Sequence, residues 1–119
     1  MKTPEDARTV RGQNMYNSVI ARHFFSVREY RLLQSLEEPN LAQEFLRIWT
    51  IKESYAKYTG QGMDETMAKR ESAGFLTGNG PIAGRNFVVS GAVIGLCGKR
   101  GFLPEEVCFV SRNFFGRFE

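Results

Sequence analysis

Apolar residues recur at helical spacing in the first half of the chain. Between Tyr16 and Phe25 they fall three or four residues apart, which predicts an amphipathic helix. Ser26 followed three residues later by Glu29 is the pattern of a capping box, in which side chain and backbone satisfy each other's hydrogen bonds. A second helix is therefore predicted from this box to about Leu36.

The longest predicted helix occupies residues 41–58. Pro39 breaks the chain before it, and Asn40 with Gln43 repeats the spacing of a capping box. Gly60 provides the expected stop, because glycine readily adopts the left-handed conformation that ends helices. One apolar face of this helix is expected to pack on a sheet, and that face consists of Leu41, Phe45, Ile48, Trp49 and Tyr55.

After Met63 the pattern changes from helical to extended. Residues 64–86 are rich in Gly, Thr, Ser and Asn and predict a long loop with a short helix or an edge strand. Three apolar runs beyond it predict strands, and a tight basic connection, Lys99-Arg100-Gly101, is expected between the last two. The predicted strands are Phe87–Val89, Ala92–Cys97 and Glu106–Ser111.

Helices first and a small antiparallel sheet after them predict an α+β fold. The 119 residues fit one domain, taken as residues 1–119, with a moderate core. Residues 1–15 are polar and charged, so they are interpreted as a loose segment or a truncated strand end.

The amino-acid composition and the net charge limit the classes of protein to which the chain can belong. Hydrophobic residues make up 42% and aromatic residues 13%, which indicates a globular chain. The net charge of +3 suits an anionic ligand or an acidic partner, and equally suits solubility alone. No apolar run is long enough to span a membrane, and Cys97 and Cys108 lack metal-ligand spacing, so we interpret them as buried free thiols of a cytoplasmic protein. With His23 as the one histidine, zinc sites and Ser-His-Asp triads are poorly supported.

Glu53 and Lys57 are the strongest candidates for chemistry. They are four residues apart and lie on one face of the predicted helix. An ordinary ion pair is one interpretation. The other is a site where the carboxylate holds a metal ion and the lysine binds a phosphate, as phosphoryl-linked group transfer requires.

Two segments resemble a known family. The run Trp49–Lys57 with Gly60 and Gly62 resembles the W-x-x-K-E-[AS]-x-x-K-x-x-G-x-G signature of 4′-phosphopantetheinyl transferases. Phe24–Tyr30 resembles the F-F-S-x-x-E-Y segment of the surfactin-synthetase-activating type. Weaker matches to the closing strands of that type lie in Val93–Gly98 and Pro104–Ser111. The likeness implies a 4′-phosphopantetheinyl transferase-like lobe, similar to the C-terminal lobe of the two-lobed enzymes.

The resemblance implies transfer of the 4′-phosphopantetheine arm of coenzyme A to a serine of an acyl or peptidyl carrier protein, with Mg²⁺ as cofactor. By position, Glu53 would bind the metal and help to deprotonate the serine. Lys57 would contact the phosphates and stabilise the leaving group, and Lys52 would support coenzyme binding. Lysine is an effective phosphate binder, and Mg²⁺ prefers carboxylates with substrate phosphates.

The second acidic metal ligand of the family matches Glu5. Thr3 stands where the family has an aspartate, and Asp6 is a possible substitute. His23 stands where an arginine precedes Phe-Phe. The alternative function is therefore a catalytically impaired homologue or isolated lobe that binds a carrier protein or coenzyme A without turnover.

The chain length resembles the single-lobe holo-acyl-carrier-protein synthases, whereas the motifs resemble the two-lobed type. Either case predicts a homo-oligomer, a dimer or trimer, since a lone lobe exposes an apolar face. Fatty-acid biosynthesis is one implied pathway. Aromatics interleaved with Arg at Arg112–Phe118 leave a nucleic-acid-binding domain as a third interpretation, but neither nucleic acid nor a membrane is the expected partner.

Overall fold

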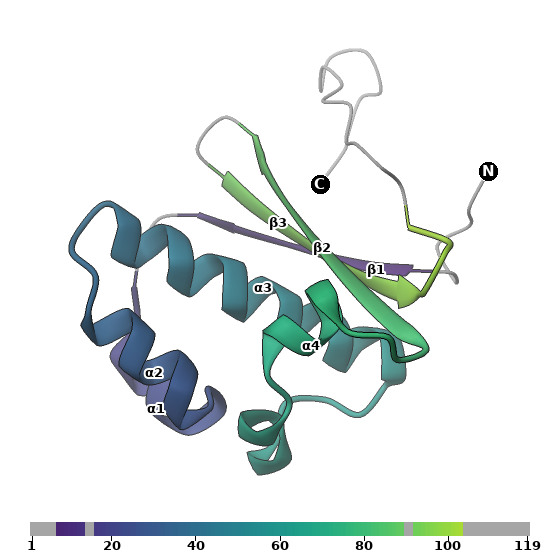
Figure 1. The fold of residues 1–119 in the computed structure, drawn as a ribbon, viewed down its shortest axis with the longest axis horizontal. Helices are drawn as coiled ribbons and strands as arrows, with labels where there is room; N and C mark the ends of the chain where they lie inside the picture. Colours follow the sequence, from purple (N-terminus) through teal and green to yellow (C-terminus); the bar gives the residue numbers. More distant parts are fainter. Residues whose placement is uncertain (1–6, 14–15, 90–91, 104–119) are drawn as a thin grey trace.

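The computed structural model describes residues 7–13 (backbone only), 16–89 and 92–103. Its elements follow one another along the chain in the order β1 (Ala7–Gln13), α1 (Ser18–Phe24), α2 (Val27–Gln34), α3 (Asn40–Thr59), the 3₁₀ helix η2 (Glu65–Lys69), α4 (Ser72–Thr77), β2 (Ile82–Val89) and β3 (Ala92–Lys99). Figure 1 shows α3 lying across one face of the sheet, with α1 and α2 beside its first half and α4 between α3 and β2. The predicted α+β class is confirmed.

The three described strands form an antiparallel sheet in the order β1-β3-β2. In β1, Ala7 pairs with Gly98 and Gln13 with Ala92, so this segment occupies a position beside the central strand. Of the two interpretations of the N-terminal segment, a loose segment or a strand end, residues 7–13 form a strand, because their backbone joins the ladder of β3. Several sequence predictions lie outside the described residues: the roles of Thr3, Glu5 and Asp6, the strand Glu106–Ser111, Cys108 and the tail Arg112–Phe118.

Local capping explains where the helices begin and end. The predicted box of α2 is confirmed, since Ser26 Oγ accepts from Glu29 N–H and Glu29 Oε1 accepts from Ser26 N–H. The box predicted for α3 is wrong. Its N-cap is Pro39 without a side-chain bond, and the Ala42 N–H donates to a glutamate from the preceding turn, Glu38.

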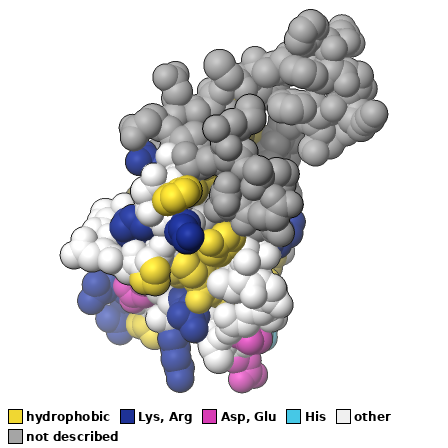
Figure 2. All heavy atoms as spheres, turned by 90° about the vertical axis from the view of Figure 1, so that its right-hand side faces the viewer, with side chains coloured by type: hydrophobic (Ala, Val, Ile, Leu, Met, Phe, Trp, Pro, Cys, Tyr) yellow, Lys and Arg dark blue, Asp and Glu magenta, His cyan; other side chains and the backbone are white. Residues whose placement is uncertain are grey.

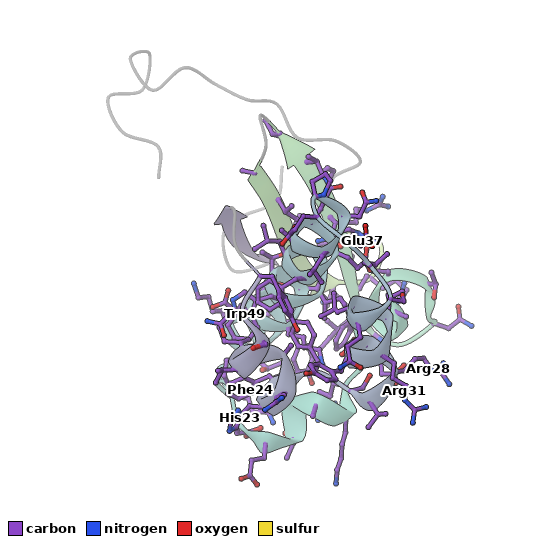
Figure 3. All side chains as sticks on the ribbon, turned by 90° about the vertical axis from the view of Figure 1, so that its left-hand side faces the viewer. His23, Phe24, Arg28, Arg31, Glu37 and Trp49 are labelled. Atoms are coloured by element: carbon purple, nitrogen blue, oxygen red, sulfur yellow. The ribbon has the colours of Figure 1, made fainter. Side chains whose placement is uncertain are left out.

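The core lies on both sides of α3. Thr50 and Ile51 approach the sheet so closely that a Cβ built on Gly95 would lie 2.5 Å from the Thr50 backbone, and one on Gly84 would lie 3.1 Å from Ile51. The neighbours of Trp49 are instead aromatic rings, at centroid distances of 5.9 to 6.4 Å, from Phe24, Phe25 and Phe45. Figure 3 shows Trp49 beside Phe24. The predicted face thus packs partly on the α1–α2 junction, and the helix residues nearest the sheet were not among those predicted.

The glycine-rich region 64–86 is more ordered than a long loop. It contains η2, α4 and the first half of β2, and two buried residues, Met67 and Ser72, fix it to the core. The predicted basic turn after β3 is confirmed, because Phe102 N–H donates to Lys99 C=O and Gly101 has a φ of 91°. Within the described ranges, no helix is both long and apolar enough to cross a membrane.

Candidate active site

The two strongest sequence candidates line one pocket at the C-terminal end of α3. The pocket has a volume of about 330 Å³. Helical geometry brings Glu53 and Lys57 to the same side of α3, one turn apart. Its lining residues are Glu53, Ala56, Lys57, Gly60, Gly62 and Met63.

Two glycines close the pocket by turning the chain back over the helix end. Gly60 has a φ of 74° and Gly62 a φ of 79°, both in the left-handed region that disfavours side chains with a Cβ. The Gly62 N–H then donates to the Ala56 C=O at 3.4 Å, which satisfies one of the last carbonyls of α3. The predicted stop at Gly60 is confirmed, and the G-x-G spacing also builds the pocket wall.

Glu53 is half-buried and Lys57 is exposed. Burial raises the pKa of the Glu53 carboxyl above its ordinary value, and the charge of Lys57 opposes this rise. Among the described residues, the ion pairs within 4 Å are Arg28–Glu71, Arg47–Glu44 and Lys52–Glu29, and none involves Glu53. The simple ion-pair interpretation is therefore not what the structure has, and the carboxylate is left open to a ligand.

Lys52 lies apart from this pocket and is fully buried, with 0% of its surface exposed. Its ammonium donates to Phe24 C=O at 2.8 Å and to Met67 C=O at 3.0 Å, and pairs with Glu29 Oε1 at 2.8 Å. These three acceptors use all three of its N–H groups. Burial lowers the pKa of Lys52, against the opposing charge of Glu29. Its predicted contact with the coenzyme stays a prediction.

Glu5, the second predicted metal ligand, is outside the described residues, two positions before β1. That strand starts with Ala7 opposite Gly98 and contacts α3. The neighbouring Cys97 lies against Ile51 C=O, at 3.5 Å. The chain therefore enters the sheet at the level of the second half of α3. Within the described part of the chain, no group of three or more His, Cys, Asp or Glu residues could hold a metal ion.

The long-range partners of Glu29 were not predicted from the sequence. Its role in the capping box was predicted, but its partners Lys52 and Ser72 come from segments far along the chain. The predicted buried thiol of Cys97 is confirmed, and burial raises its pKa to about 11. No local pattern indicates that Ser72 reaches Glu29.

A larger hollow, of about 730 Å³, lies along β2 and contains none of the predicted site residues. Three arginines line it, Arg47, Arg85 and Arg100, and none of them is without a partner. Arg47 pairs with a glutamate, and Arg100 donates to backbone carbonyls. We favour the smaller pocket as the active site because it combines a carboxyl group of shifted pKa with an exposed lysine.

The end of the molecule at which α3 stops faces the viewer in Figure 2. Hydrophobic side chains gather at its centre, with Lys and Arg side chains beside them. Acidic side chains are visible towards the lower edge. This described surface is suited to a ligand or partner that is both partly apolar and negatively charged.

Fold and site define an α+β domain with a carboxylate and a lysine open to a ligand at the end of its longest helix. The sequence model of the 4′-phosphopantetheinyl transferase superfamily matches residues 5–83, and the chain belongs to that superfamily. The predicted family resemblance is thereby confirmed.

Relatives match over a shorter stretch. Across 44 residues the chain is 48% identical to 4′-phosphopantetheinyl transferase HetI of Nostoc sp. and to 4′-phosphopantetheinyl transferase gsp of Aneurinibacillus migulanus. Each alignment covers 37% of this chain and 19% of the relative, so the chain spans about a fifth of the length of these curated relatives.

Proposed function

We propose that this chain acts as a 4′-phosphopantetheinyl transferase lobe, transferring the 4′-phosphopantetheine arm of coenzyme A to a serine of an acyl or peptidyl carrier protein. The supporting observation is the pocket at the end of α3, which Glu53 and Lys57 line together with Gly60 and Gly62 of the following turn. Those residues fall within the segment matched by the family model.

Magnesium is the proposed cofactor, held by Glu53 and Glu5. The Glu53 carboxylate has the chemistry that Mg²⁺ prefers and has no ion-pair partner within 4 Å among the described residues. Glu5 is a reasonable second ligand because β1 joins the sheet beside the second half of α3. When bound, the metal would neutralise charge on the pyrophosphate of coenzyme A.

In the proposed reaction, the serine oxygen forms a bond to the β-phosphorus of coenzyme A. The bond between that phosphorus and the bridging oxygen breaks, and 3′,5′-adenosine bisphosphate leaves with the electron pair. Glu53 accepts the serine proton, a role suited to a carboxyl group whose pKa is raised by burial above its ordinary value. Lys57 stabilises the negative charge that develops on the leaving group.

The proposed partners are coenzyme A and a carrier protein of fatty-acid, polyketide or nonribosomal-peptide biosynthesis. The hydrophobic and basic surface around the end of α3 supports an acidic partner (Figure 2). We further propose a cytoplasmic homo-oligomer, a dimer or trimer. Trp49 is partly buried against Phe24, Phe25 and Phe45 within the chain, so only the exposed part of its side chain could contribute to this assembly.

A binding module without turnover is the second candidate. It is favoured by the metal-ligand count, because Glu53 is the sole carboxylate lining the pocket among the described residues. Thr3, which stands where the family has an aspartate, is a second departure from the family's metal ligands.

The test is transfer to several apo carrier proteins, followed by intact-mass spectrometry of the carrier. With coenzyme A and Mg²⁺, the carrier should gain the mass of the phosphopantetheine arm, and chelation of the metal should stop the gain. If calorimetry shows that coenzyme A binds but the mass of the carrier does not increase, the transferase proposal is wrong and the binding module is supported.

A further inference from the structure

A single buried carboxylate, that of Glu29, connects three segments of the chain: α2 with its N-cap, α3 and α4. Glu29 Oε1 accepts from the Ser26 N–H at 2.9 Å and pairs with Lys52 at 2.8 Å. Its second oxygen accepts from the N–H and the hydroxyl of Ser72, at 2.7 and 2.9 Å. Four donors thus fill the acceptor positions of one carboxylate whose residue is 6% exposed.

Lys52 extends this connection to two further carbonyls. Phe24 C=O is at the end of α1 and Met67 C=O is in η2, and both accept from the same ammonium that pairs with Glu29. Lys52 has 0% of its surface exposed and Glu29 6%, so water can replace little of what either partner provides. A buried ion pair that loses one partner leaves an uncompensated charge, which is strongly unfavourable.

The Glu29–Lys52 pair binds the part of the chain that follows the pocket wall. That wall, Gly60–Met63, follows α3 directly and leads into η2. Its near end is fixed by the bond from Gly62 to Ala56 C=O. Its far end is fixed where Met67 binds Lys52 and Ser72 binds Glu29. Lys52 also immediately precedes Glu53 on α3.

We propose that Glu29 and Lys52 are a pair of positioning residues, which hold the wall Gly60–Met63 and α3 in register for the chemistry of Glu53 and Lys57. Lys52 then has this role in place of a contact with the coenzyme, since its three N–H groups already have acceptors. The catalytic consequence rests on the proposed function, whereas the ordering of the wall does not.

The experiment compares Glu29→Gln, Lys52→Gln and the double variant. Both charges are absent from the double variant, which therefore contains a neutral pair. Glutamine at position 52 still has two N–H donors for the carbonyls of Phe24 and Met67. Each single variant should melt about 10 °C or more below the wild type and exchange the amide hydrogens of Gly60–Met63 faster. The double variant removes the uncompensated charge and should recover part of both losses, because glutamine at position 29 keeps only one of the two oxygens that accept from Ser26, Lys52 and Ser72. Lys69→Gln, an exposed lysine of η2, is the control for loss of charge.

Measurements of turnover distinguish a positioning role of Lys52 from a direct contact of Lys52 with coenzyme A. If the pair positions the wall, the double variant should also recover part of the turnover that each single variant loses. The proposal is overturned if the double variant recovers nothing, or if Lys52→Gln raises the KM for coenzyme A while Gly60–Met63 exchange as in the wild type. Absence of turnover in the wild type would contradict the proposed function alone, because melting and exchange still report on the wall.

Discussion

At the scale of single residues, Lys52 and Glu53 are adjacent in the sequence but differ in burial and in their protein partners. Glu53 is half-buried in the pocket, whereas the Lys52 ammonium is enclosed by protein acceptors. Helical periodicity alone predicted that Glu53 and Lys57 share a face, and this is confirmed. The burial of Lys52 could not be predicted, because its acceptors come from α1, α2 and η2, which only the folded chain brings together.

The raised pKa of Glu53 predicts a pH-dependent difference in stability. A carboxyl group with a raised folded-state pKa contributes stability below its ordinary pKa, and this contribution is lost as pH rises through the raised value. Glu53→Gln cannot ionise. Without Mg²⁺, it should therefore melt at a higher temperature than the wild type at about pH 7, and the advantage should shrink towards about pH 4.

Thermal melts of both proteins across this pH range provide the measurement. A difference in melting temperature that does not vary with pH would mean that burial does not disfavour the charged form of Glu53.

Lys57 is predicted to act through its charge. Lys57→Met should lower turnover by about 10²- to 10³-fold, as expected when a group aimed at a developing negative charge is removed. Affinity for the carrier protein should change little. The matched control is Lys69→Met, which removes an exposed lysine from η2. Equal turnover in the two variants would exclude Lys57 from phosphate handling.

At the scale of elements, the sequence predicted the helices better than the strands. The apolar spacing and the Ser26–Glu29 box are local signals, and α1, α2 and α3 lie where those signals placed them. The pairing of β1 with β3 depends on residues about 90 positions away along the chain, which no local pattern can reveal. The start of β2 was likewise missed, because Gly78 and Gly80 before it and Gly84 within it are typical of a loop.

Close contact between α3 and β3 predicts an unequal effect of two glycine substitutions. In Gly95→Ala, the new Cβ would lie 2.5 to 2.6 Å from atoms of Thr50, two of them backbone atoms, so the helix must shift. The free energy of unfolding should fall by about 2–3 kcal/mol. In Gly74→Ala, on α4, the Cβ meets no atom within 4 Å, and the variant should gain about 0.5 kcal/mol.

Urea unfolding of both variants gives these free energies. Similar values for the two would contradict the close packing of α3 on the sheet.

At the scale of the whole molecule, the family and the α+β class followed from the sequence, because the signature is local and the order of elements is simple. The way in which the elements enclose the pocket could not be predicted from the sequence. The wall Gly60–Met63 is defined by anchors at Met67 and Ser72, and these bind partners 15 and 43 residues away along the chain. Long-range contacts of this kind depend on tertiary packing rather than on any local pattern.

Glu53 is the central residue of this account, and transfer by a Glu53→Ala protein tests it most directly. The readout is the intact mass of an apo carrier protein incubated with coenzyme A and Mg²⁺. Glu65→Ala, which removes an exposed carboxylate of η2, is the control. Wild type and Glu65→Ala should convert the carrier equally, whereas folded Glu53→Ala should lose at least about 10³-fold in rate. An unchanged rate for a well-folded Glu53→Ala protein would contradict the proposed active site.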